Sequence, residues 1–182
     1  MAAIDVPGYV TELKDHASEH GFHIHDERHF VETYSLRQAW EIDLHPAKAC
    51  GGPLDLHFSL EIDPRVLLAF EDLAQDFEQD LPDEHYFTLT LTWDLPPLAS
   101  PPNLLTLAID LAGVGEIELP LEVSATDSFA SPTDAAERKI SIVAHKNISL
   151  LKIVDGEDTL CEVFDRCLSV SDFLLEAITR WL

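Results

Sequence analysis

Hydrophobic residues recur along this chain with two periods, and the longer period predicts helices. Apolar side chains three or four positions apart predict a helix over residues 7–20, where Asp5 serves as the N-cap and Gly21 ends the helix. The same spacing follows Asp63 and predicts a second helix over residues 64–80. Each helix has one apolar face, so we expect both to pack on a common core.

The end of the chain shows the same helical period. Phe173, Leu174 and Ile178 lie on one face of a terminal helix, which we expect to begin at Ser171 as its N-cap. A shorter helix is predicted over residues 159–168. We expect the apolar face of the terminal helix to dock on a sheet.

The shorter period, of two residues, predicts strands, because successive side chains of a strand point to opposite faces of a sheet. This alternation occurs in residues 30–44, 54–62, 87–93, 105–111, 117–123, 139–145 and 148–154. The first two segments flank a loop that contains Gly and Pro, and we expect them to pair as a hairpin. Most of the segments alternate apolar with polar residues, so the sheet is expected to have one buried face and one wet face.

Together these elements predict an α+β fold. We expect one acidic domain, residues 1–182, in which a largely antiparallel sheet of about six or more strands carries N-terminal, central and C-terminal helices on one face. The wet face of the sheet is expected to display carboxylates and threonines, namely Glu41, Asp43, Asp55, Glu61, Thr88, Thr90, Thr92, Glu118 and Glu122.

The chain is strongly acidic, with 34 Asp and Glu against 11 Lys and Arg and a formal net charge of −23. Residues 66–137 contain no Lys or Arg, and the densest acidic run, EDLAQDFEQDLPDEH, spans residues 71–85. Such a charge distribution repels nucleic acid and anionic lipid and attracts cationic surfaces. We therefore expect a basic protein partner, and neither nucleic acid nor a membrane. The carboxylates expected to contact that partner are Glu71, Asp72, Asp76, Glu78, Asp80, Asp83, Glu84, Glu118 and Glu122.

The alternative is that the acidity serves solubility alone. A chain from a proteome adapted to high salt would show the same composition and the same excess of surface carboxylates. The sequence leaves both explanations open.

The sequence lacks the motifs of several common enzyme classes. It has only seven glycines, and they form neither a GxGxxG nor a GxxxxGK[ST] phosphate loop, nor a GxSxG nucleophile motif. Asp76, Glu78 and Asp80 match the first three ligands of an EF-hand, but Phe87 stands at the twelfth position, so we reject a calcium loop. We therefore assign no catalytic residue, expect no cofactor and favour a function that is not enzymatic.

Cysteine usage and hydropathy point to a cytoplasmic protein. Cys50, Cys161 and Cys167 are odd in number and lack CxxC spacing, which predicts reduced thiols instead of a disulfide framework. No secretory signal pattern and no apolar stretch of about 18 residues occurs in the sequence.

Histidines gather at the end of the first predicted helix, in the segment HASEHGFHIHDERH. His16 and His20 are four positions apart and share a helix face, so they can bind one metal ion, and His23 and His25 can complete the ligand set beyond the Gly21 turn. The alternative is a group of solvent-exposed histidines, which the helix C-terminus and nearby carboxylates favour.

Three functions fit these features. The first is a non-enzymatic acidic binding protein, of the immunity, antitoxin or inhibitor kind, that recognises a basic protein. The second is a secretion-chaperone-like or regulatory adaptor. The expected order of helix, three strands, helix, two strands and helix resembles the type III secretion chaperone fold over about the first two-thirds of the chain, and this resemblance implies a small acidic protein that is usually dimeric. The third is a metal-binding protein or hydrolase that uses the histidine cluster. In each case the chain is expected to be a monomer or a homodimer.

Overall fold

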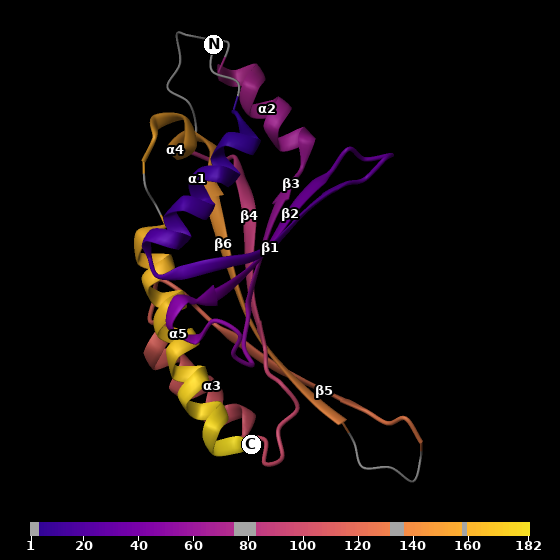
Figure 1. Cartoon of the computed structure of the whole chain (residues 1–182). Helices are drawn as coiled ribbons and strands as arrows, with labels where there is room; N and C mark the ends of the chain where they lie inside the picture. Colours follow the sequence, from indigo (N-terminus) through magenta and orange to yellow (C-terminus); the bar gives the residue numbers. More distant parts are fainter. Residues whose placement is uncertain (1–3, 75–82, 132–136, 158–159) are drawn as a thin grey trace.

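The computed structural model describes residues 4–74, 83–131, 137–157 and 160–182 (Figure 1). The helices and strands, in chain order, are α1 (Val6–Glu19), β1 (Phe22–Val31), β2 (Gln38–Pro46), the short helix η1 (Ala47–Ala49), β3 (Leu56–Ile62), α2 (Pro64–Ala74), β4 (Tyr86–Asp94), α3 (Leu104–Gly115), β5 (Glu122–Ser128), β6 (Glu137–Ser149), α4 (Leu150–Asp155) and α5 (Cys161–Trp181).

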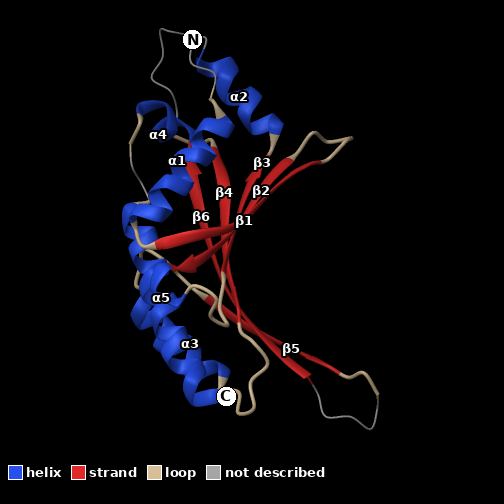
Figure 2. Ribbon diagram, viewed as in Figure 1, coloured by secondary structure: helices blue, strands red, loops and turns tan. Residues whose placement is uncertain are grey.

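The strands form one six-stranded sheet in the order β1-β2-β3-β4-β6-β5, and every neighbouring pair is antiparallel. Helices α1, α3, α4 and α5 lie on one side of this sheet, and α2 lies beyond the end of β3 (Figure 2). The predicted α+β class, with an antiparallel sheet and N-terminal, central and C-terminal helices, is therefore confirmed.

The core lies between the sheet and the helices. Directly opposed residues of antiparallel strands share a face, and the row Trp40, Leu60 and Leu89 runs across three central strands on the helix side. Leu13 of α1 and Phe164 of α5 are buried against this face. In the central strands, the predicted alternation therefore arises because successive residues face this core and the solvent in turn.

The first predicted helix is confirmed by α1, and the second by α2 over the residues that the structure describes. Asp5 caps α1 by accepting a hydrogen bond from the Gly8 amide, at 3.1 Å. Residues 75–80 of the second predicted helix lie outside the described part of the chain.

The expectation of one strand over residues 30–44 was wrong at its start. The chain turns back between Glu32 and Arg37, where Leu36 has a φ of 57°, and β2 begins only at Gln38. The preceding strand β1 was missed, because nine of its ten residues are exposed and its sequence shows no apolar alternation.

Residues 105–111, predicted as a strand, belong to the helix α3. The Asn103 side chain accepts a hydrogen bond from the Thr106 amide at 3.1 Å and caps this helix. Leu107 and Leu111, four positions apart, are its buried leucines. The strand predicted over residues 117–123 was also wrong over most of its length, because turns precede β5, which begins at Glu122.

The two strands predicted over residues 139–145 and 148–154 are one strand, β6, followed by the short helix α4. The two C-terminal helices are one continuous helix, α5. Ser171 is therefore not an N-cap. It is buried in the middle of α5, where its hydroxyl accepts a hydrogen bond from the Trp93 indole N–H at 2.9 Å.

Candidate functional site

The face of the sheet opposite the helices is the first candidate site. In the described part of the chain no helix covers it, as Figure 2 shows. We call it the open face and define it by three rows of opposed residues: Phe30, Ala39, Glu61, Thr88 and Asn147; Arg28, Glu41, Ser59, Thr90 and His145; and Asp26, Asp43, His57, Thr92, Val143 and Glu122. The prediction placed seven of these residues on the wet face of the sheet, the three threonines among them.

Carboxylates surround one arginine and one histidine at the centre of the open face. Arg28 Nη2 lies 2.9 Å from Asp43 Oδ2, and Arg28 Nε lies 3.7 Å from oxygens of both Glu41 and Asp26. His57 Nδ1 lies 2.7 Å from the other Asp43 oxygen, and its Nε2 lies 4.0 Å from Glu41. Three carboxylates thus share a single permanent cation, and the group is held in fixed geometry on three neighbouring strands.

Two further ion pairs border the open face at opposite ends. At one end Arg37 Nη2 lies 3.0 Å from Asp63 Oδ2. The backbone N–H of Arg65 has the largest effect on the pKa of Asp63 and lowers it. Burial opposes this, and the Arg37 guanidinium lowers the pKa further, so the pKa lies below its usual value. At the other end Lys139 Nζ lies 2.6 Å from Asp94 Oδ2.

A pocket of about 460 Å³ lies where the open face meets α2. Its lining combines the aromatic rings of Phe30 and Tyr86 and the side chain of Val66 with the Arg37 and Asp63 pair. Beside it, the turn between β1 and β2 carries Tyr34, which is 98% exposed. This end of the open face is therefore more apolar than its centre.

The structure divides the carboxylates that were predicted to contact a partner. Glu71 and Asp72 lie on α2, and Asp83 and Glu84 lie in the turn before β4; the helix and this segment are neighbours, because the His85 and Phe70 rings are 6.0 Å apart. Residues Asp76, Glu78 and Asp80 lie outside the described residues.

The two remaining carboxylates of that set lie elsewhere. Glu122 begins β5 and belongs to the open face. Glu118 was expected on the sheet, which is wrong, because it lies in the turn after α3 and its carboxylate is 4.0 Å from Arg166 Nε on α5. The predicted set is therefore not one surface.

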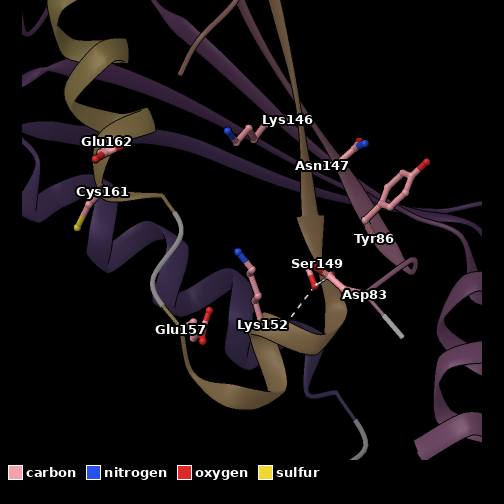
Figure 3. A pocket seen from close by; sticks show the side chains of 9 residues that line it. All are labelled: Asp83, Tyr86, Lys146, Asn147, Ser149, Lys152, Glu157, Cys161 and Glu162. Atoms are coloured by element: carbon pink, nitrogen blue, oxygen red, sulfur yellow. Dashed lines mark hydrogen bonds between the residues drawn. The ribbon is translucent and has the colours of Figure 1, made fainter. Parts of the chain in front are cut away.

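A pocket of about 730 Å³ opens between β6, α4 and the start of α5 (Figure 3). Its lining combines two lysines with carboxylates and neutral polar groups: Asp83, Tyr86, Lys146, Asn147, Ser149, Lys152, Glu157, Cys161 and Glu162. The Ser149 hydroxyl donates a hydrogen bond to Asp83 and accepts one from the Lys152 amide, which caps α4. The lysines and carboxylates nearly balance, so this pocket shows no clear charge preference for a ligand.

The histidine cluster is rearranged relative to the prediction. His16 and His20 do share a face of α1, with their rings parallel and 4.7 Å apart. His23 and His25 lie on β1 instead, where the His25 ring packs against His45 at 4.4 Å. The structure therefore does not bring the four predicted metal ligands together.

The third group near His16 and His20 is Cys161, the first residue of α5. The nitrogen and sulfur atoms of these three side chains that can bind a metal all lie within 4.8 Å of one another. A fourth side chain also contacts this group, because His20 Nδ1 lies 2.7 Å from Asp165 Oδ1. Sequence reasoning missed both Cys161 and Asp165, because they are more than a hundred residues away along the chain and no local spacing links them to the histidines.

Comparisons with protein-family models, with curated proteins and with solved structures give no match to this chain. Among the described helices, none combines the length and the apolar character that a bilayer crossing requires.

Proposed function

We propose that this chain is a non-enzymatic acidic binding protein, of the immunity, antitoxin or inhibitor kind, whose open face recognises a basic protein. One observation carries the proposal: a complete sheet face, free of helices in the described part of the chain, presents carboxylates in register on adjacent strands. The chain as a whole carries a formal net charge of −23.

The geometry suits recognition of Lys and Arg side chains. Carboxylates on a hydrogen-bonded sheet are already fixed in position, so a partner loses little binding energy in ordering them. Glu41 and Asp43 keep oxygens within reach of a second cation after pairing with Arg28, because a carboxylate accepts several hydrogen bonds. The field of the whole chain would also accelerate association with a basic partner at low salt.

Capture of a partner on the immobilised chain tests this proposal. Lysate of the cells that express the gene is applied in about 50 mM and about 500 mM KCl, a range over which surface electrostatic attraction weakens strongly. The wild type is compared with an open-face variant, Glu41→Gln/Glu61→Gln/Glu122→Gln. A control variant, Asp110→Asn/Glu162→Gln/Glu176→Gln, removes the same charge from exposed positions on the helix side.

We expect a basic protein that is captured at low salt and released at high salt. In titrations with that purified partner, the open-face variant is expected to bind at least about tenfold more weakly, since each truncated charge contact contributes on the order of 1 kcal/mol. The control variant should keep most of the affinity. A neutral or acidic partner, capture that persists at high salt, or equal losses in the two variants would each contradict the proposal.

A second candidate function, an adaptor similar to secretion chaperones, is favoured by a different observation. Apolar side chains are exposed together near the turn between β1 and β2, where Phe30, Val31, Tyr34 and Leu36 are each about half exposed or more. The observed order α1-β1-β2-β3-α2 also keeps the first part of the order on which that resemblance was based, although one strand, β4, instead of two precedes the next helix, α3. A stable homodimer in light scattering that Tyr34→Ser/Leu36→Ser converts to monomer would favour the adaptor.

A further inference from the structure

We propose that His16, His20 and Cys161 form a zinc site that joins the N-terminal helix to the C-terminal helix. The proposal is independent of the open face, which lies on the other side of the sheet. It rests on the position of the three side chains, their chemistry and the group that orients one of them.

The positions are fixed by the core. Leu13 and Ala17 of α1 are buried, and they hold the same turns of the helix that carry His16 and His20. Both imidazole rings stack on Phe164, at 5.5 and 6.1 Å, and Phe164 is itself 1% exposed. One face of each ring is therefore occupied by the core.

The distances suit a four-coordinate metal once the parallel rings of His16 and His20 turn toward a common point. Zn–N bonds of about 2.0–2.1 Å and a Zn–S bond of about 2.3 Å in a tetrahedron place ligand atoms roughly 3.3–3.6 Å apart. The present separations, all within 4.8 Å, differ from those values by an amount that side-chain rotation can close. Two imidazoles and a thiolate are ligands that favour Zn²⁺ over Mg²⁺ or Ca²⁺, and three protein ligands leave a fourth position for water.

Asp165 supports a metal site independently of the distances between the three ligands. Its carboxylate lies 2.7 Å from His20 Nδ1, so the hydrogen bond there leaves Nε2 of the same ring to bind a metal. Asp165 is one helical turn after Cys161 on α5, and the two residues therefore face α1 together. The N-terminus of α5 also lies at Cys161, where the positive end of the helix dipole stabilises a negatively charged ligand.

The site is accessible to a metal from solution. Cys161 is exposed and lines the large pocket between β6 and α5, which Glu157 and Glu162 also line (Figure 3). His16 lines a second, smaller hollow, and Glu157 borders both. These carboxylates raise the local concentration of divalent cations.

Titration with metal alone tests the proposal. The reduced chain, freed of metal with a chelator, is titrated with Zn²⁺ in competition with a chromophoric chelator, and with Co²⁺ followed by absorption spectroscopy. We expect one equivalent to bind at micromolar concentration or below. The Co²⁺ complex should show a thiolate charge-transfer band and the strong visible bands of a tetrahedral ion.

Matched variants separate this site from the general acidity of the chain. Cys161→Ser and His20→Ala should each abolish tight binding, while Cys50→Ser, at another exposed cysteine, and His23→Ala should leave it unchanged. Asp165→Asn should weaken binding about 10–100-fold and keep the charge-transfer band, because Asp165 is a positioning residue and not a ligand.

Circular dichroism of each variant confirms that the fold is intact before titration. Three results would overturn the proposal: no tight equivalent of Zn²⁺, a Co²⁺ spectrum without a thiolate band, or binding that survives Cys161→Ser. The last result would mean that groups other than Cys161 hold the metal.

Discussion

Replacement of Ser171 by Ala tests how much one buried hydrogen bond contributes to this fold. The Trp93 indole N–H donates to the Ser171 hydroxyl at 2.9 Å, and both residues are at most 1% exposed. Ser171→Ala leaves the indole N–H in the core without that acceptor, which costs about 1–3 kcal/mol in the free energy of unfolding. The higher helix propensity of Ala opposes this loss by up to about 0.7 kcal/mol.

Ser169→Ala is the matched control. Ser169 lies on the same helix, is exposed, and donates its hydroxyl hydrogen to the Asp165 carbonyl oxygen at 2.9 Å. Ser169→Ala therefore gives the same gain in helix propensity as Ser171→Ala, but it does not remove a buried hydrogen-bond acceptor. The difference between the two variants isolates the Trp93 hydrogen bond, and we expect Ser171→Ala to be less stable than Ser169→Ala by about 1–3 kcal/mol.

Urea unfolding followed by far-ultraviolet circular dichroism measures this difference, and thermal unfolding should show about 2–4 °C for each kcal/mol in a chain of this length. Adding Trp93→Phe closes a double-mutant cycle. If the hydrogen bond carries the effect, Ser171→Ala should cost much less in the Trp93→Phe background than in the wild type. Equal urea midpoints for the two serine variants would refute the reasoning.

Three further predictions follow from single residues. Burial raises the pKa of the Cys167 thiol, so a thiol reagent should modify the other two cysteines of the native chain and reach Cys167 only on unfolding. Gly21 has a φ of 88°, so Gly21→Ala should destabilise the fold by about 1–2 kcal/mol. Gly113 lies within α3 and a Cβ added there meets no atom within 4 Å, so Gly113→Ala should stabilise the fold by about 0.5–1 kcal/mol, and urea midpoints measure both effects. Burial raises the pKa of Asp94, but hydrogen bonds led by that from Lys139 outweigh it and hold the pKa below 3.8. The contribution of Asp94 to stability is therefore present above that pH, and the advantage of wild type over Asp94→Asn should shrink as the pH falls below it; an advantage independent of pH would contradict this.

Sequence patterns predicted the central strands well because these strands have a core on one side and water on the other. In β3 and β4 the buried and partly exposed residues alternate almost without exception. Helix α3 shows where this logic fails. Leu105, Leu107, Ile109 and Leu111 alternate as in a strand, yet Leu105 and Ile109 are 71% and 64% exposed. A helix with apolar residues on both faces does not show the helical period of hydrophobic residues in its sequence. Asn103, which follows two prolines and caps the helix, was the better indication that a helix begins here.

The candidate sites could be predicted only as far as they are local. His16 lies in the last turn of α1 and His20, four residues on, is its C-cap, so the pair was visible in the sequence. Cys161 and Asp165 reach them only because α5 packs against α1, and a contact between the two ends of the chain leaves no spacing to recognise. For the open face, the sequence predicted which residues of the central strands face water. The position of Arg28 among the carboxylates could not be predicted, because it depends on how β1 is aligned with β2.

The outer edge of β1 has a consequence for how concentrated preparations of this protein behave. β1 is at the end of the strand order, so its backbone N–H and C=O groups along one side have no strand to pair with in the described sheet. Such an edge is a template on which a second molecule can add its own strand and begin a fibre. Asp26, Glu27 and Arg28 lie at the middle of that edge. A second copy that docked there would have to place its own charged residues next to them. We therefore expect these three charges to act as a barrier to polymerisation, and a chain with Ser at all three positions to form assemblies that bind thioflavin under conditions in which the wild type stays dispersed.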